Sequence, residues 1–327
     1  MNSTDQGAPA GTFKAAPFIK EIGRGKKGAR NLSREDARAL YAAMLHGQVS
    51  DIEMGGILVA MRIKGESVDE LCGFMEAAEA QLQLVPQPPG EYAPVLIPSY
   101  NGSRQLPNLT PLLACLLARE GVPVLVHGVV DDPGRVTTAR ILQQMGLPRA
   151  ATHAEIAASF AARQPAFMQI DVLAPAMARL LEIRRVLGLR NSTHTMVKIL
   201  QPFAGPALRL CSYTHPEYLE LLTGYFLHAP AARGDAFLMR GTEGETVANP
   251  KRANQIEWFH AGSKTVLVER QPPQDSLPDL PPTDALASAR WIQQALAGIA
   301  PIPPAIVEQA EHCQRIARAI MQVGTAA

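Results

Sequence analysis

The sequence lacks any apolar stretch typical of a membrane span or an export signal. The first twenty residues, MNSTDQGAPAGTFKAAPFIK, contain no continuous apolar core of signal-peptide length. The most apolar later stretch, residues 112–130, is interrupted by Arg119 and Glu120. We therefore expect neither export nor contact with a membrane, and we expect a cytoplasmic location.

Cysteine is also scarce, and its placement excludes the common metal-binding patterns. The four cysteines are scattered through apolar segments without CxxC spacing: Cys72, Cys115, Cys211 and Cys313. This distribution is typical of buried thiols in a reducing compartment. We expect no zinc site, no other metal site and no cofactor.

Aromatic residues make up only 5% of the chain, and they do not alternate with basic residues as in a base-stacking platform. The formal net charge is +1, but the charge is unevenly placed. Basic residues gather between positions 14 and 38 and between 179 and 209, whereas the chain beyond residue 275 is mainly acidic. This asymmetry fits a basic face for an anionic partner, and it fits equally a set of charges that only solvate helix surfaces.

The N-terminal quarter predicts a small helical domain. Residues 1–12 are small and polar, and we expect a disordered tail there. Helix N-termini are indicated by Ser33, Ser50 and Ser67, each followed three residues later by an acid. Apolar stripes of helical period follow each of them. The segment 85–90, VPQPPG, breaks any helix, so we place the helical domain at residues 13–86.

The rest of the chain predicts an α/β domain over residues 90–327. Strand-like runs at 95–98, 122–127, 208–212 and 236–240 alternate with helical segments, and two further helices are expected near 285–296 and 305–321. Such alternation is typical of βαβ units. The predicted fold class is α/β: an N-terminal helical bundle domain plus a larger α/β domain with a mainly parallel sheet.

Residues 97–111, IPSYNGSRQLPNLTP, connect the first expected strand to the helix that follows it. In α/β proteins such a loop commonly binds phosphate through its backbone N–H groups. Several segments around this loop resemble glycosyltransferase family 3, which includes anthranilate phosphoribosyltransferase and the pyrimidine nucleoside phosphorylases. They are residues 32–78, NLTP at 108–111, GVPVLVHG at 121–128 and LGLR at 187–190 with TMVKILQPFAGPA at 195–207. The resemblance implies a phosphoribosyltransferase type of fold, in which a helix at about 174–188 packs on the helical domain.

The same comparison predicts that the phosphate loop is degenerate. Where the enzymes carry GTGGDG, this chain reads PSYNGS at 98–103, so that Pro98 offers no N–H and Tyr100 introduces a ring. The family's KHGNR is VHGVV at 126–130, and a neutral asparagine of the family is Lys198. We expect no catalytic residue. The residues of the degenerate loop are Ser99, Asn101, Gly102, Ser103, Asn108 and Thr110.

Three further positions leave alternatives open. The family's magnesium-binding stretch HGxDGLDE is RGTEGETV at 240–247, where Glu243 and Glu245 could hold a hard cation although the adjacent acidic pair is gone. His127 is read as a hydrogen-bonded structural histidine in preference to a general base. The segment DDPG at 131–134 suits a turn better than a metal site.

Taken together, these departures resemble the YbiB-type branch of the family, a group of bacterial DNA-binding proteins. The resemblance implies a homodimer, formed through the helical domain, that binds DNA or RNA without sequence preference. Two alternatives remain: a pentosyltransferase with an altered phosphate site, and a sensor of a small anion or nucleotide.

Candidate nucleic-acid contacts fall into two groups. The first is expected at a basic cleft between the domains and includes Arg179, Arg184, Arg185, Arg190, Lys198 and Arg104. Arg135 could face the same cleft. The second is interleaved with glycines, as in a flexible arm or an ordinary solvated loop, and comprises Lys20, Arg24, Lys26, Lys27 and Arg30.

Overall fold

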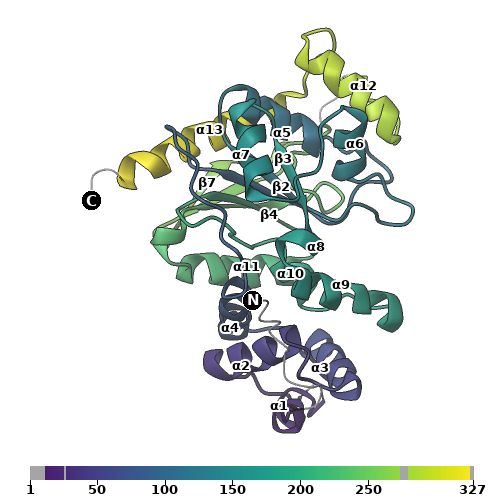
Figure 1. Ribbon diagram of the computed structural model, residues 1–327, viewed down its shortest axis with the longest axis vertical. Helices are drawn as coiled ribbons and strands as arrows, with labels where there is room; N and C mark the ends of the chain where they lie inside the picture. Colours follow the sequence, from purple (N-terminus) through teal and green to yellow (C-terminus); the bar gives the residue numbers. More distant parts are fainter. Residues whose placement is uncertain (1–11, 26, 273–278, 325–327) are drawn as a thin grey trace, which may run out of the picture. The chain divides into compact units, whose positions relative to one another are not determined.

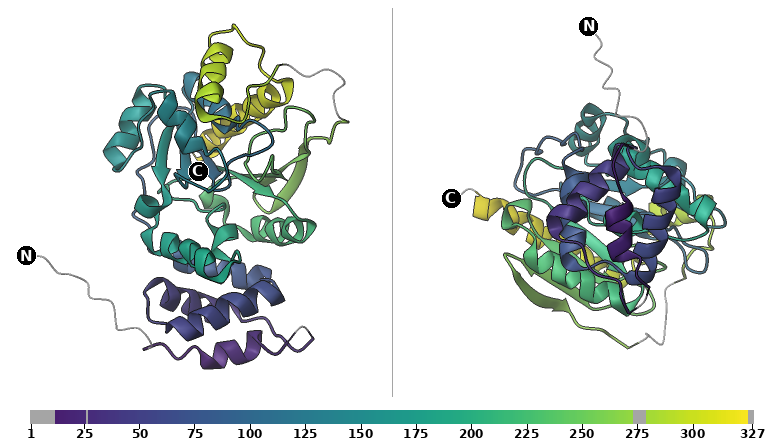
Figure 2. Two further views of the ribbon diagram at one scale, coloured as in Figure 1. Left: turned by 90° about the vertical axis from the view of Figure 1, so that its right-hand side faces the viewer. Right: turned by 90° about the horizontal axis from the view of Figure 1, so that it is seen from below.

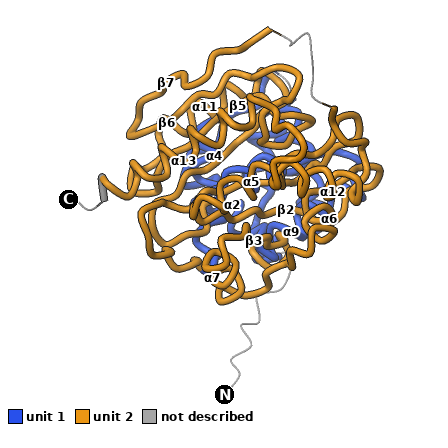
Figure 3. Tube along the Cα trace, turned by 90° about the horizontal axis from the view of Figure 1, so that it is seen from above, with its two compact units in different colours: residues 1–83, 174–200 blue, residues 84–173, 201–327 orange. Residues whose placement is uncertain are grey.

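The computed structural model describes residues 12–25, 27–272 and 279–324. The chain divides into two compact units, coloured separately in Figure 3. Unit 1 is drawn from residues 1–83 and 174–200, and unit 2 from residues 84–173 and 201–327. The predicted disordered tail lies almost wholly outside the described residues. None of the described helices is long and apolar enough to cross a membrane.

Unit 1 is helical, as its N-cap signals predict. Its helices are α1 (Ala16–Ile22), α2 (Arg34–Leu45), α3 (Asp51–Lys64), α4 (Val68–Glu79), α9 (Pro175–Leu187) and α10 (Thr193–Met196), and Figures 1 and 2 show α1 to α4 at the purple end of the colour range. Ser33 and Ser67 accept hydrogen bonds from the third backbone N–H of α2 and α4, and Ser50 forms a capping box with Glu53. The three predicted starts are confirmed, whereas α1 was not predicted.

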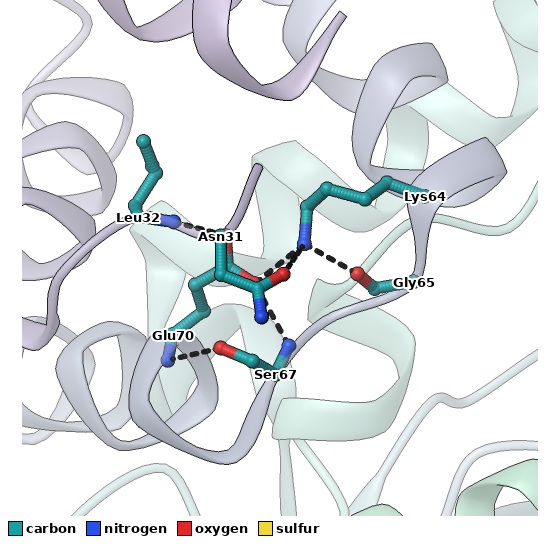
Figure 4. A network of polar contacts seen from close by, with 6 residues as sticks. All are labelled: Asn31, Leu32, Lys64, Gly65, Ser67 and Glu70. Carbon is teal, nitrogen blue, oxygen red and sulfur yellow. Dashed lines mark hydrogen bonds and ion pairs between the residues drawn. The ribbon is translucent and has the colours of Figure 1, made fainter. Parts of the chain in front are cut away.

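One buried carboxylate joins three segments of unit 1 (Figure 4). Glu70, in the first turn of α4, is fully buried. Its Oε1 accepts the backbone N–H of Leu32 at 2.8 Å, and its Oε2 accepts the backbone N–H of Ser67 at 2.8 Å and the Lys64 ammonium at 2.6 Å. A buried charge is tolerated when it is paired and hydrogen-bonded in this way. The network connects the chain before α2 to the end of α3 and the start of α4.

Helix α9 and the short α10 complete unit 1. The hydroxyl of Tyr41, in α2, lies 2.9 Å from Oγ1 of Thr193 in α10. An Nη2 of Arg179, in α9, donates to the backbone carbonyl of Leu45 at 2.7 Å. These contacts tie residues 174–200 to the N-terminal helices although some 90 residues of unit 2 separate them in sequence.

Unit 2 is built on a sheet that has seven strands in the described residues, in the order β3-β2-β1-β4-β5-β6-β7. The first five pair in parallel: β1 (Val95–Ser99), β2 (Val124–Gly128), β3 (Ala166–Gln169), β4 (Leu208–Tyr213) and β5 (Ala236–Arg240). The antiparallel strands β6 (Ile256–His260) and β7 (Ser263–Val268) extend one edge. The predicted fold class, with its mainly parallel sheet, is confirmed.

Helices cover the sheet of unit 2. They are α5 (Thr110–Arg119), α6 (Thr138–Gln144), α7 (His153–Ala161), α8 (Ile170–Leu173), α11 (Pro216–His228), the 3-10 turn η1 (Ala231–Arg233), α12 (Ala285–Leu296) and α13 (Pro304–Gly324). Along β1, Val95 and Ile97 join the apolar cluster that contains α5, α12 and α13, whereas Leu96 joins a second cluster with Ile156 and Phe203. The alternation shows that β1 is buried on both faces, as a central parallel strand should be.

Candidate functional site

The loop between β1 and α5 is held in a tight conformation by close backbone approaches. Gly128 ends β2 beside it, and a Cβ at this position would lie 1.7 Å from the carbonyl oxygen of Ser99. Gly102 has a φ of +63°, and a Cβ there would lie 2.8 Å from the carbonyl oxygen of Val136. Both positions therefore require glycine. The loop retains the tight backbone that a phosphate-binding turn needs.

A carboxylate from the segment that follows β5 accepts hydrogen bonds from the first part of this loop. Oε1 of Glu245 accepts the backbone N–H groups of Asn101 at 2.9 Å and Gly102 at 2.7 Å. Glu245 is only 1% exposed. The amide of Asn101 donates to the carbonyl of Gly244 at 2.9 Å, where a Cβ would come within 2.2 Å of that amide nitrogen. Successive N–H groups of this kind bind anions, and here the anion is a side chain.

Glu243 occupies the second part of the loop in the same way. Its carboxylate accepts the backbone N–H groups of Arg104 at 2.6 Å, Gln105 at 2.9 Å and Leu106 at 2.8 Å. Glu243 has a φ of +54°, a left-handed conformation that is costly for a residue with a Cβ. Three charge-assisted hydrogen bonds offset that cost. The two glutamates thus act as internal anions that accept five backbone N–H groups of the loop.

Beside this loop, Tyr100 and His127 form a buried pair. The Tyr100 hydroxyl lies 2.8 Å from Nδ1 of His127, and the two rings meet edge to face. Burial lowers the pKa of His127 to about 3 and raises the pKa of Tyr100 well above its usual value. Both side chains are therefore neutral near pH 7. The hydrogen bond to Tyr100 agrees with the interpretation of His127 as a structural histidine.

The remaining residues of the predicted degenerate loop are brought together by hydrogen bonds to one another and to the start of α6. Oγ of Ser99 donates to Oγ1 of Thr138 at 2.8 Å, and the amide of Asn108 donates to the same oxygen at 3.0 Å. Oδ1 of Asn108 accepts the backbone N–H of Thr110 at 3.1 Å. Ser103 forms a two-way backbone bridge with Val136. These polar groups serve the loop's own structure.

Arg104 and Arg135 both belong to this region of unit 2. The side chain of Arg104 is exposed, and Nη1 of Arg135 donates to the carbonyl of Gly102 at 3.2 Å. The backbone N–H of Arg135 also bonds to the carbonyl of Asp132 at 3.1 Å, which closes a turn over residues 132–135 and agrees with the turn expected for the segment DDPG. Over the described ranges, no group of three or more His, Cys, Asp or Glu residues could hold a metal ion.

Three of the predicted cations in unit 1 act electrostatically on one histidine. Burial lowers the pKa of His194 to about 4, and the positive charges of Arg190, Arg184 and Lys198 contribute in the same direction. His194 lies in α10, and its Nδ1 is 3.2 Å from Oδ1 of Asn191. The charges of three basic side chains thus act on the His194 imidazole. We call Arg184, Arg190 and Lys198 the basic cluster.

The other two predicted cations of this region have local roles. The Arg179 guanidinium caps the carbonyl of Leu45, as described above. Nε of Arg185 pairs with Glu182 at 2.8 Å on the exposed face of α9. The predicted position of this whole set at a cleft between the two domains stays a prediction.

The basic residues at 20–30 do not form the free arm that the sequence allowed. Lys20 belongs to α1, and Glu21 pairs with Arg24 at 2.6 Å and with Arg30 at 3.8 Å. The backbone N–H of Arg30 also bonds to the carbonyl of Glu21 at 3.0 Å, which folds the segment back onto α1. Lys27 is exposed, and Lys26 lies outside the described residues. Contact of these residues with nucleic acid stays a prediction.

Comparison with known proteins identifies the relatives of this chain. Residues 16–81 match the helical bundle domain of the glycosyl transferase family. The chain is 45% identical over 299 residues to the protein YbiB of Escherichia coli (strain K12), covering 90% of this chain and 92% of that protein. The chain belongs to the YbiB family. Its similarity extends to anthranilate phosphoribosyltransferase of Beijerinckia indica subsp. indica, with 27% identity over 289 residues, 86% of this chain and 81% of that one.

Solved structures show that this member of the YbiB family shares its fold with anthranilate phosphoribosyltransferase. The crystal structure of anthranilate phosphoribosyltransferase (TrpD) from Thermus thermophilus superposes with a TM-score of 0.67, at 19% identity over 93% of this chain and 94% of that one. The structure of the Saccharomyces cerevisiae enzyme in complex with PRPP and Mg has a TM-score of 0.67 at 13% identity. The match covers 95% of this chain and 94% of that one. At such identities the likeness concerns the fold alone.

Proposed function

We propose that this protein binds nucleic acid without sequence preference, as a homodimer, and does not transfer a pentosyl group. The observation that carries the proposal is the basic cluster, whose three positive charges act on His194 and add to burial, the main cause of its lowered pKa. Cations gathered within residues 184–198 attract the phosphate groups of a polyanion. The low aromatic content of the chain supports contact with the backbone in preference to base stacking.

A transferase is the second candidate, favoured by the relatives that are named anthranilate phosphoribosyltransferase. The closed loop argues against it. Phosphate that entered this turn would have to displace Glu243 and Glu245 from five backbone N–H groups, and Glu245 is buried. Two negative charges beside the loop would also repel a pyrophosphate. The loop thus supports a binding protein that has lost the enzyme's phosphate site.

The dimer part of the proposal is supported by exposed apolar side chains on unit 1. Ile52 and Ile63, at opposite ends of α3, are 90% and 66% exposed, and Val186 on α9 is also exposed. Large aliphatic side chains at this exposure gain free energy when a second surface covers them. A second copy of the same helices would cover them and double the number of basic clusters that one polymer can reach.

Titration with random single-stranded and double-stranded oligonucleotides at several salt concentrations tests the proposal. The logarithm of the affinity should fall linearly with the logarithm of the salt concentration, by about 0.7 to 0.9 per phosphate contact. The triple variant Arg184→Ala, Arg185→Ala, Lys198→Ala should bind every sequence more weakly and show a shallower slope. Arg290→Ala, an exposed residue on α12 in unit 2, is the matched control. Unchanged binding by the triple variant, which lacks two of the three members of the basic cluster, would contradict the proposal.

A further inference from the structure

A second polar site lies at the edge of the sheet in unit 2, where no predicted residue falls. A cavity of ≈ 300 Å³ opens at the carboxyl ends of β4 and β5, beside the start of β6 and the first turn of α11. Its volume is at the lower end of the ~300–1,000 Å³ typical of small-molecule sites. The residues that matter here are Tyr213, Leu219, Leu238, Arg240, Glu257 and Arg270. The carboxyl ends of parallel strands are where α/β proteins bind ligands.

Two guanidinium groups supply this cavity with positive charge. Arg240 ends β5 and Arg270 follows β7, and both are exposed. Within the described ranges neither guanidinium has a hydrogen-bond or ion-pair partner. The first turn of α11, a helix of 13 residues, adds the positive end of its dipole through Pro216, which lines the cavity. An anionic group would therefore be stabilised from three elements.

A buried carboxylate lies on the wall of the same cavity. Glu257 is 6% exposed, and its Oε1 accepts the Lys264 ammonium at 2.9 Å and the Gln255 amide at 3.2 Å. Oε2 of Glu257 is buried and has no hydrogen-bond partner among the described residues. A buried oxygen without a donor is unfavourable, and more so when it carries charge. A ligand that brings an N–H donor would satisfy it.

The positive and negative groups converge on one aromatic ring. The pKa of Tyr213 is raised by burial and by the charge of Glu257, and it is opposed by the charges of Arg240 and Arg270. All three charged groups therefore act on the Tyr213 hydroxyl. With Leu219 and Leu238, the ring gives the cavity an apolar wall between its cationic and anionic groups.

We propose that this cavity binds one nucleotide. The phosphate would meet Arg240 and Arg270, whose forked donors suit its oxygens, and an N–H of the base would donate to Glu257. The base would lie against Tyr213, since aromatic rings stack readily on bases. A free nucleoside monophosphate and the terminal nucleotide of a polymer share this chemistry. The site is independent of the basic cluster, and it does not need the proposed binding of polymers.

Calorimetric titration with guanosine monophosphate, a nucleotide whose base carries adjacent N–H donors, tests the assignment. The variant Arg240→Ala, Arg270→Ala should weaken its binding at least tenfold, whereas Arg290→Ala should leave it unchanged. Glu257→Gln should weaken the nucleotide severalfold but leave binding of inorganic phosphate unaffected, because only the base reaches Glu257. Thermal unfolding midpoints establish that each variant is folded.

Competition experiments identify the source of the nucleotide and separate the two proposals. If a 5′-phosphorylated oligonucleotide displaces guanosine monophosphate and the unphosphorylated one does not, the polymer end is the ligand; if neither does, it is the free nucleotide. The triple variant Arg184→Ala, Arg185→Ala, Lys198→Ala should retain nucleotide binding even if it loses oligonucleotides. The proposal is overturned if the parent does not bind guanosine monophosphate, or if the double arginine variant binds it as tightly as the parent does. Displacement of the nucleotide by the free amino acid glycine would overturn it as well.

Discussion

Replacing Glu245 by leucine, the residue at this position in the family stretch HGxDGLDE, tests whether the loop is held closed by its own anions. In the parent, Oε1 of Glu245 satisfies the backbone N–H groups of Asn101 and Gly102 at 2.9 Å and 2.7 Å. Leucine has a similar size but accepts no hydrogen bond. Glu245→Leu therefore leaves two buried donors without a partner in an otherwise intact loop.

The expected loss of stability follows from those two donors. Each buried N–H without a partner costs about 1–3 kcal/mol, so Glu245→Leu should lower the free energy of unfolding by about 2–6 kcal/mol. This is a large share of the ~5–15 kcal/mol by which folded domains are stable. Removal of the carboxylate also opens the turn to an external anion. Phosphate at a hundred times its dissociation constant would restore about 2.7 kcal/mol.

Urea unfolding with and without inorganic phosphate measures both effects. For the parent, the free energy of unfolding in phosphate should be close to that in sulfate at equal ionic strength. Glu245→Leu should be less stable than the parent, and phosphate should raise its free energy of unfolding more than sulfate does. Glu311→Leu, on the exposed side of α13, controls for the loss of one negative charge. The reasoning fails if Glu245→Leu is as stable as the parent, or if phosphate stabilises both proteins equally.

Four further outcomes follow from the structure. The pKa of His127 is about 3 in the folded protein and about 6.5 in the unfolded chain, so the unfolded chain binds this proton as the pH falls below 7 while the folded protein does not. The free energy of unfolding should therefore fall by about 2 kcal/mol from pH 7 to pH 5 because of this one group. Urea unfolding of His127→Gln should not show this contribution. The pKa of His194, about 4, should rise when an oligonucleotide neutralises the basic cluster, and NMR titration with and without the oligonucleotide measures this; an unchanged value would place the polymer elsewhere. Sedimentation at micromolar concentration should find dimers of the parent and monomers of Ile52→Asp, Ile63→Asp; a monomeric parent contradicts the proposed assembly. Assays of phosphoribosyl transfer to anthranilate should detect no product, and turnover that His127→Gln or Glu243→Gln abolishes would refute this.

Local signals in the sequence predicted the elements that depend on neighbouring residues. Ser33, Ser50 and Ser67 start α2, α3 and α4 because each cap is satisfied within three residues of itself. The edge strand β7 was missed because most of its side chains are exposed, and its place depends on pairing with β6. The strand β3, at the other edge, was also missed, because its buried residues Ala166, Phe167 and Met168 form too short an apolar run to be told from a helix segment.

The site was predictable only in outline. The loss of glycines at 98–103 predicted a departure from the enzymes, but the sequence could not show which groups accept the N–H groups of the turn. Glu245 lies more than 140 residues from the N–H groups that it satisfies. In the sequence alone, Glu243 and Glu245 could hold a cation or accept backbone N–H groups. The fold shows that they accept the N–H groups. His194 was missed because a lone histidine in NSTH carries no signal of the cations around it.

The Glu70 network has a consequence for association. Helix ends ordinarily fray, but the last residue of α3, Lys64, is fixed by a buried ion pair beside the exposed Ile63. The same carboxylate anchors the start of α4 and the chain that enters α2. An apolar surface held in one conformation loses little conformational entropy when a second surface covers it. Unit 1 therefore presents a preorganised face, on which docking requires no prior folding.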